Sequence, residues 1–436
     1  MTMIMSKLQR FGRIRQLHTI ISQEIIRPSS PTPPHLRTHN LSLLDQFAAH
    51  IHLPIVFFYP NYNHDNANIL KKSLSQCLTQ YYPFAGRFPG PNTSHINCND
   101  EGVVFMEASI NTRLNDFILQ KEKEKEKEEM VDQLIPNGLG CSVHNTSPNL
   151  IEVQLNHFTG GGAAVAVAIS HKAGDGFTIV NFFNHWATIA RGGSPINPTF
   201  IPSTITTTKM PEFELKGIEK LNYARKRFVF PNSKLNELKN KVNAMGKIPI
   251  NPTRVELVTS LLFKCAGRAA TTNSGSSKPS NLLFAVNMRN KIIKNCPLMA
   301  AGNISTMVIA NMADSGEINL NEVIDKLRNG IMELLGLRDV QEAAENQLGR
   351  FSMLAGDLET RVYTCSSLCG FPLYELDFGW GKPVDIMVRF PDVNDSCVLL
   401  MDTPSRDGIE ALVRLEKEEM AIFQKDQELL AYVEDI

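Results

Sequence analysis

The 436-residue sequence has no excess of charge of either sign and no long hydrophobic run. Lysine plus arginine number 44 and aspartate plus glutamate 45, giving a net charge of -1 and no basic footprint for nucleic acid. No apolar run reaches the roughly 18 residues that a membrane-spanning helix needs. Eight cysteines without a Cys-x-x-Cys pair favour a reducing compartment over a disulfide scaffold. We therefore expect a cytoplasmic protein with neither nucleic acid nor membrane as a partner.

Several catalytic and cofactor-binding motifs are also absent. The sequence has no Gly-x-Ser-x-Gly elbow and no His-Glu-x-x-His zinc motif. Gly246-Lys247 and Gly381-Lys382 are followed by Ile and Pro, so neither completes a phosphate-binding loop. Gly379-Trp380-Gly381 begins like a dinucleotide fingerprint but lacks the third glycine. We expect no metal and no permanently bound cofactor.

Patterns of strands and helices alternate along the whole chain. Strands are predicted at residues 53–59, 151–155, 163–170, 227–230, 282–286, 386–390, 398–401 and 411–415, and helices at 69–82, 177–189, 235–242 and 254–270. The last helix begins at a capping box, Thr253 with Glu256. Residues 194–220, rich in proline and threonine, are predicted to link two halves. The pattern favours an α/β fold, or α+β with mixed sheets, in two lobes.

Residues 1–20 form a basic leader. Lys7, Arg10, Arg13 and Arg15 lie among apolar residues, and no acidic residue precedes Glu24. Such a composition suits an organelle transit peptide, and it equally suits a disordered segment before the fold. We expect the fold to begin at about residue 21.

One histidine stands where α/β proteins place their sites. His171 ends the apolar strand 163–170, and Lys172-Ala173-Gly174-Asp175-Gly176 leads into the next helix. Because an imidazole titrates near neutral pH, this histidine could act as an acid or base. The alternative is a structural histidine that caps the helix, followed by an ordinary N-terminal aspartate. His157, on the preceding strand, is interpreted as structural.

A second motif lies some two hundred residues later, Asp377-Phe378-Gly379-Trp380-Gly381. Together with His171-x-x-x-Asp175, it resembles the plant BAHD acyl-CoA-dependent acyltransferases, and most closely the vinorine synthase-like group. Further matches to the family pattern cover nearly the whole chain beyond the leader: Leu41-Ser42-x-x-Asp45, Tyr82-Pro83-x-Ala85-Gly86-Arg87, Cys98-x-x-x-Gly102, Asn287-x-Arg289 and Gly302-Asn303.

The resemblance implies two chloramphenicol-acetyltransferase-like lobes with a channel between them. Residues 21–200 would form the N-terminal lobe with the histidine motif, and residues 226–436 the C-terminal lobe with the second motif. Residues 201–225 would be the crossover linker. Acyl-CoA, the co-substrate, would enter the channel from one face and the acceptor from the other. His171 would then remove a proton from the acceptor.

The resemblance also implies roles for other residues. Asp175 would turn away from His171 into an ion pair with Arg289, and Asp377 to Gly381 would shape the CoA-side lobe. A hydroxyl of Ser366 or Ser367 could donate to the developing oxyanion, or simply end a strand. Relatives commonly carry Trp where this sequence has Leu368, which puts any carried-over acceptor preference in doubt.

The leading hypothesis is transfer of an acyl group, acetyl by default, to a hydroxyl or amine of a plant specialised metabolite such as an alkaloid. One alternative is an acylsugar- or other alcohol-acylating enzyme that uses longer or branched acyl-CoA. Two others are a hydrolase in which His171 activates water, and a catalytically silent binding protein on the same fold. We expect a monomer.

Overall fold

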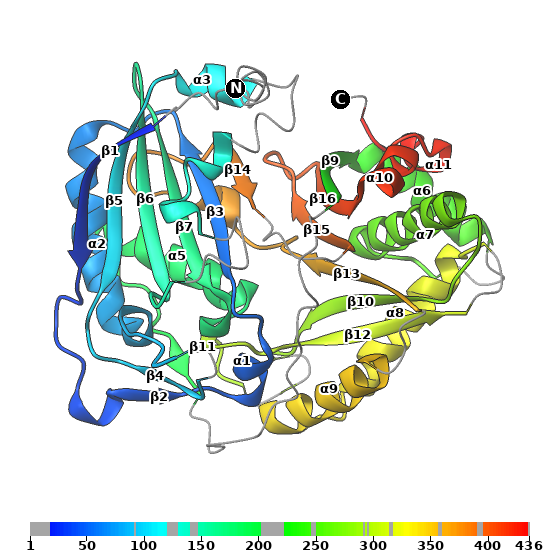
Figure 1. Cartoon of the computed structure of the whole chain (residues 1–436), viewed down its shortest axis with the longest axis horizontal. Coiled ribbons are helices and arrows are strands. Elements are labelled where there is room, and N and C mark those ends of the chain that lie inside the picture. The colour runs from blue at the N-terminus through cyan, green and yellow to red at the C-terminus, as the bar shows by residue number, and fades with distance from the viewer. Residues whose placement is uncertain are drawn as a thin grey trace, which may run out of the picture.

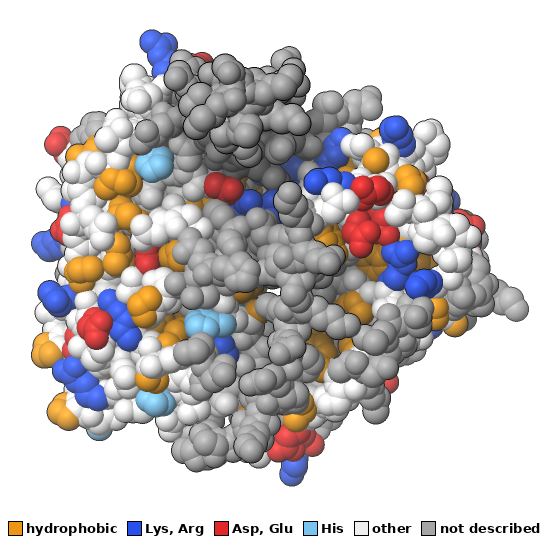
Figure 2. Space-filling model, in the orientation of Figure 1, with side chains coloured by type: hydrophobic (Ala, Val, Ile, Leu, Met, Phe, Trp, Pro, Cys, Tyr) orange, Lys and Arg blue, Asp and Glu red, His pale blue; other side chains and the backbone are white. Residues whose placement is uncertain are grey.

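The computed structural model describes residues 18–90, 93–119, 130–139, 147–201, 222–245, 250–290, 293, 296–313, 317–355, 360–389 and 396–434. Within these residues the chain forms two six-stranded mixed sheets, one in each of the lobes that lie side by side in Figure 1. Basic and acidic side chains are interspersed over both lobes on the face shown in Figure 2, in keeping with the net charge of -1.

The first sheet has the order β1-β5-β6-β7-β3-β14. These strands are β1 (His18–Ile26), β5 (Val103–Ile110), β6 (Ile151–Phe158), β7 (Ala163–Ser170), β3 (His52–Tyr59) and β14 (Asp385–Val388). Only β5 and β6 pair in parallel. Helices α2 (Ala67–Gln80) and α5 (Gly176–Ala190) cover one face, and α3 (Leu114–Leu119) packs on the other.

Strand β7 confirms the expectation of a central strand buried on both faces. Ala163, Val165, Val167 and Ile169 belong to the core beneath α2 and α5, whereas Ala164 and Ala166 belong to the core on the α3 side. All eight residues of the strand are buried. Burial on both sides explains why this run is apolar at nearly every position rather than alternating.

The second sheet has the order β12-β10-β13-β15-β16-β9. These strands are β12 (Ser305–Met312), β10 (Ser280–Asn287), β13 (Arg361–Ser367), β15 (Ser396–Asp402), β16 (Gly408–Glu416) and β9 (Tyr223–Pro231). Strand β13 pairs in parallel with both β10 and β15. The helices of this half are α6 (Asn232–Met245), α7 (Arg254–Ser274), α8 (Leu320–Leu334), α9 (Val340–Ala355), α10 (Lys417–Phe423) and α11 (Gln427–Leu430).

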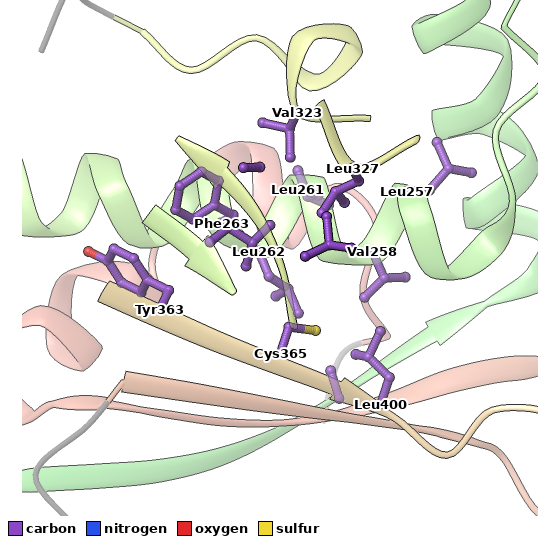
Figure 3. Packing of buried hydrophobic residues seen from close by; sticks show 14 of the residues in the cluster. Leu257, Val258, Leu261, Leu262, Phe263, Val323, Leu327, Tyr363, Cys365 and Leu400 are labelled. Atoms are coloured by element: carbon purple, nitrogen blue, oxygen red, sulfur yellow. The ribbon is translucent and has the colours of Figure 1, made fainter. Parts of the chain in front are cut away.

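Helix α7 forms the centre of the second core (Figure 3). Phe263 of α7 lies against Tyr363 of β13, with ring centroids 5.5 Å apart, and Leu261 of α7 lies beside Leu327 of α8. The predicted capping box is present, because Thr253 Oγ1 accepts from Glu256 N at 3.2 Å and Glu256 Oε2 accepts from Thr253 N at 2.7 Å. Gly275, with φ 72°, ends the helix in the left-handed conformation that glycine adopts without strain.

Several short elements lie outside the two large sheets. Strands β2 (Thr38–Asn40) and β4 (His95–Asn97) pair with each other, as do β8 (Thr199–Phe200) and β11 (Ala300–Ala301). Helix α1 (Leu43–Phe47) lies between the lobes near α9. The 3-10 turns are Pro34–Leu36, His64–Asn66, Tyr82–Ala85, Pro136–Gly138, His171–Ala173 and Leu373–Glu375.

Two boundaries differ from the expectations. Strand β1 begins at His18 and pairs its first three residues with β5, so the fold starts before the expected residue 21. Strand β14, from the C-terminal half of the sequence, pairs with β3 and completes the first sheet, so the chain returns to the first lobe. Most of the expected linker, residues 202–221, lies outside the described residues.

No helix in the described part of the chain combines the length and apolarity needed to span a bilayer. The seven cysteines that the structure describes are all free thiols.

Candidate active site

His171 lies at the junction of β7 and α5. It opens the 3-10 turn His171–Ala173, and Asp175 caps the N-terminus of α5 by accepting from Thr178 N. The backbone of His171 is held at both ends: its N–H donates to Ile51 O at 2.9 Å, and its carbonyl accepts from Asn303 Nδ2 at 2.9 Å. The carbonyl also accepts from Gly174 N at 3.3 Å. These contacts fix the turn between the two lobes.

The imidazole of His171 is not part of a carboxylate-oriented triad. Its Nδ1 is buried and has no hydrogen-bond partner among the residues described. Both oxygens of Asp175 are occupied elsewhere: Oδ1 accepts from Thr178 and Arg289, and Oδ2 accepts from Arg289 and Ile304 N. A triad would need one of those oxygens to face the ring nitrogen.

The expected ion pair between Asp175 and Arg289 is present and buried. Arg289 Nη1 lies 2.8 Å from Asp175 Oδ2 and Nη2 lies 3.1 Å from Oδ1, and the two side chains are only 1% and 6% exposed. Burial alone would raise the pKa of Asp175, but the charge and hydrogen bonds of Arg289 outweigh it, so the pKa lies below its ordinary value. The carboxylate is therefore ionised at neutral pH.

Arg289 ties the histidine loop to the second lobe. Its Nε donates to Ala300 O at 2.9 Å and its Nη2 to Gly302 O at 2.9 Å. Its guanidinium lies 4.5 Å from the ring centroid of Phe177, in the first turn of α5. A bidentate, fully bonded guanidinium is the arrangement in which a buried charge pair is tolerated.

A lysine and two further histidines surround the turn. Lys172 Nζ donates to Gln46 O, at the end of α1, at 2.9 Å. Burial lowers the pKa of Lys172, although nearby Asp45 opposes the shift. Burial also lowers the pKa of His50 and of His52, and Lys172 contributes to the lowering at His50. Both imidazoles are therefore neutral at pH 7.

The end of β13 approaches this loop from the second lobe. A Cβ placed on Gly176 would lie 3.0 Å from Leu368 Cδ2, so Leu368 contacts the histidine motif directly. Leu368 is half-buried and packs against the core of the first lobe. Ser366 and Ser367 are also half-buried, and Ser367 Oγ accepts from Cys369 N at 3.2 Å.

The second motif, residues 377–381, forms a tight turn that carries two stacked aromatic side chains. Asp377 Oδ1 accepts from Gly379 N at 2.7 Å and from Gly381 N at 3.0 Å. Both glycines have positive φ, a conformation that glycine adopts without strain, which explains why glycine stands at both positions. Phe378 and Trp380 stack with ring centroids 5.7 Å apart.

Phe378 and Trp380 pack in the first lobe, whereas residues 377–381 were expected to belong to the C-terminal lobe. Phe378 belongs to the core beneath α5, where its ring lies 4.9 Å from that of Trp186. Trp186 is ten residues beyond Gly176 along α5, about 15 Å at 1.5 Å per residue. The motif holds the far end of the helix that starts beside His171.

A cavity of about 550 Å³ lies beside the histidine turn, with walls from both lobes. Its lining comes from residues 42–43 and 45 around the start of α1, residues 199–201, residues 293, 296–297 and 301–304, and residues 338–341 at the start of α9. It includes Asp45 and Asn303 but not His171. Among the described residues, no group of three or more His, Cys, Asp or Glu side chains could hold a metal ion.

Several residues around the turn have no role that the sequence reveals. Asp45 and Asn303 stand out only as parts of family patterns, and nothing in the sequence singles out Lys172, His50 or Thr178. Thr178 Oγ1 donates to Gly302 O at 2.8 Å and accepts from Gly302 N at 3.1 Å. A threonine at the third position of a helix carries no sequence signal for such a contact between lobes.

Two mixed sheets in adjacent lobes, with a histidine turn fixed between them, define a two-lobed α/β protein. Residues 18–430 match the model of the Transferase family. Akuammiline synthase 1 of Alstonia scholaris is 37% identical, over 94% of this chain and 97% of that protein. Deacetylvindoline O-acetyltransferase of Catharanthus roseus is 33% identical, over 97% and 99%. The crystal structure of vinorine synthase superposes with a TM-score of 0.77 at 30% identity, covering 96% of this chain and 98% of that one.

The chain belongs to the Transferase family, the BAHD acyl-CoA-dependent acyltransferases of plants. The family resemblance and the mixed α/β fold are thereby confirmed. The protein is an acyltransferase, and acyl-CoA is the co-substrate of this family.

Proposed function

We propose that His171 is the general base of a direct acyl transfer. In this reaction the acceptor O–H or N–H gives its proton to the imidazole as the oxygen or nitrogen attacks the thioester carbonyl. The tetrahedral intermediate then collapses, the C–S bond breaks, and the CoA sulfur takes the proton back from the imidazole. The products are the acylated acceptor and free CoA.

The observation that carries this proposal is the state of Nδ1 in the His171 ring, which is buried and has no hydrogen-bond partner among the described residues. Nε2 is therefore the ring nitrogen left to exchange a proton with a substrate. No serine or cysteine among the described residues hydrogen-bonds to the ring, as an acyl-enzyme route would require. A hydroxyl of Ser366 or Ser367 is a candidate donor to the oxyanion, because β13 ends against the same loop.

We further propose that the acceptor is a plant alkaloid hydroxyl and the donor acetyl-CoA. The names akuammiline synthase and deacetylvindoline O-acetyltransferase support the acceptor class, and the second supports acetyl. Incubating the purified protein with a panel of acyl-CoA thioesters and an alkaloid extract of the source tissue, followed by mass spectrometry, tests both. Acylation of sugars alone would overturn the acceptor class, and CoA release without an acylated product would indicate a hydrolase.

The same proposal includes a cytoplasmic monomer that holds no permanent cofactor and requires no targeting leader. We expect a chain without residues 2–17 to keep its kcat, because the first strand and the family match both begin at residue 18. A truncation through residue 20 would instead remove three paired residues of β1. Assaying both truncations, and imaging a fluorescent fusion, tests this. Organelle import that depends on residues 1–17 would contradict it.

Leu368→Trp is expected to raise the KM for a bulky acceptor. Leu368 already touches the backbone of Gly176, so the larger indole must extend into the space beside the histidine loop. Slow CoA release in the absence of acceptor should not change, if the acyl-CoA end of the channel is unaffected. The KM values and the melting temperature are measured on one preparation, with Leu368→Met as a size-matched control.

If the indole instead enters the packed core, overpacking would cost about 1–3 kcal/mol. A destabilised Leu368→Trp variant with unaltered acceptor kinetics would show that this side chain belongs to the core and not to an acceptor pocket.

A further inference from the structure

Asn303 connects the second lobe to the histidine turn. It lies between β11 and β12 and is 4% exposed. Its Nδ2 donates to His171 O at 2.9 Å and to Asp45 Oδ1 at 2.9 Å, and its backbone N donates to the same Oδ1 at 2.6 Å. Because both partners of the side-chain amide are acceptors, the amide can take only one orientation.

Asp45 is fixed from its other side. Its Oδ2 accepts from Ser42 N at 2.9 Å and from Ser42 Oγ at 2.7 Å, which closes the capping box of α1. The next residue of α1, Gln46, accepts from Lys172 Nζ, so the helix is also tied to the residue after His171. We call the contacts from Asp45 through Asn303 to the His171 carbonyl the Asp45–Asn303 bridge.

The bridge matters because no described residue forms a hydrogen bond to Nδ1 of the His171 ring. Since Nδ1 has no partner among the described residues, the direction of the imidazole depends on the backbone that carries it. The other bond to the His171 carbonyl, from Gly174 N, is longer at 3.3 Å. Removing the bridge would leave the carbonyl with that bond alone and let the turn rotate.

We propose that Asn303 and Asp45 are positioning residues for acyl transfer, which aim the imidazole of His171 by fixing its backbone carbonyl. The inference rests on the proposed role of His171 as the base. It makes catalysis depend on the contact between lobes, since His171 directly follows a strand of the first lobe and Asn303 lies in the second.

Asn303→Ala tests the bridge. A displacement of about 1 Å in a reacting group can cost roughly 100-fold in rate, so we expect kcat to fall by about 10- to 100-fold. The KM values for acyl-CoA and acceptor should change by less than about twofold, because in this proposal the bridge acts on the backbone of His171 and not on a substrate. The midpoint of the pH profile of kcat/KM should not move, since the base itself is unchanged.

The matched control is Asn319→Ala, which removes an exposed N-cap of α8 far from the turn. It should lower the melting temperature and leave kcat unchanged. A purely structural role for Asn303 would give the same pattern, with kcat per folded molecule intact, and that result would overturn the proposal.

A double-mutant cycle with Asp45→Ala adds a second readout. If both residues act through one carbonyl, the double variant should lose no more kcat than the worse single variant. If the kcat losses of the two single variants instead multiply in the double variant, the two residues do not act through the same carbonyl. Should Asn303→Ala fail to fold, Asn303→Ser takes its place, because its side chain is too short to reach both acceptors.

His171→Ala on the same preparation separates the two hypotheses. If His171→Ala still transfers acyl groups, the proposed function fails. If it is inactive while Asn303→Ala keeps more than half of the wild-type kcat, only the inference about the bridge fails.

Discussion

His171→Ala should lower kcat by about 10²- to 10⁴-fold, the usual contribution of a general base. The loss should leave the fold intact, because the contacts of His171 to Ile51, Gly174 and Asn303 all use its backbone and remain in the alanine variant. The reaction is followed by CoA release and by mass spectrometry of the acylated acceptor. Circular dichroism and the melting temperature report on the fold.

His157→Ala is the matched control for this result. His157 lies on β6 opposite Ala163, at the other end of β7 from His171. Its Nε2 is 2.8 Å from Glu107 Oε2, a contact that serves the sheet rather than the histidine turn. The control should lose stability and keep its kcat per folded molecule. A His171→Ala variant with near-normal kcat and an unchanged spectrum would show that the proposed mechanism is wrong.

Features of the fold that depend on residues close together in the sequence could be predicted. The apolar run of β7 and the capping box Thr253 with Glu256 each depend on neighbouring residues, and both formed as expected. The return of β14 to the first sheet could not be predicted in this way. It pairs Ile386 with Phe57, more than three hundred residues apart, and no local pattern selects one sheet over the other.

The start of the fold was missed for a related reason. β1 is an edge strand, and most of its residues are exposed, so its sequence shows no clear alternation of buried and exposed positions. Pairing with β5 defines the strand, and the paired residues lie between 77 (Ile26 with Val103) and 92 (His18 with Ile110) positions apart in the sequence.

The residues of the candidate site also differ in how far apart in the sequence their partners lie. His171 and Asp175 could be found because they lie four residues apart, and Arg289 was assigned to Asp175 through the family resemblance. The Asp45–Asn303 bridge joins residues 258 positions apart. Asparagine and aspartate are ordinary surface residues in a sequence, and only burial at 4% exposure in the folded chain gives these two a role.

Asp175→Asn should destabilise the protein and abolish most activity together. The amide cannot balance the charge of Arg289, and leaving a buried charge without its partner costs about 3–5 kcal/mol. The amide nitrogen would also face donors, because Oδ2 now accepts from Arg289 and from Ile304 N. The melting temperature and kcat are measured together, and both should fall.

A control makes the same carboxylate-to-amide change in an exposed ion pair, and so shows whether the effect of Asp175→Asn depends on the burial of its pair. Glu322→Gln removes one partner of an exposed i,i+4 pair with Lys326, whose atoms are 3.0 Å apart. Exposed pairs of this kind contribute about 0.5 kcal/mol or less, so this control should behave like the wild type.

Arg289→Ala should reproduce the effect of Asp175→Asn from the other side of the ion pair. It leaves the Asp175 carboxylate buried with only the hydrogen bonds from Thr178 and Ile304 N, and it removes the contacts that Arg289 makes with Ala300 and Gly302. If the ion pair serves only to hold the histidine loop in place, the two variants lose stability and activity in parallel. In a triad role Asp175→Asn alone would be inactive at wild-type stability, because the carboxylate would be needed to orient the ring. That second outcome would require Asp175 to leave Arg289 and turn toward Nδ1 of His171 during the reaction.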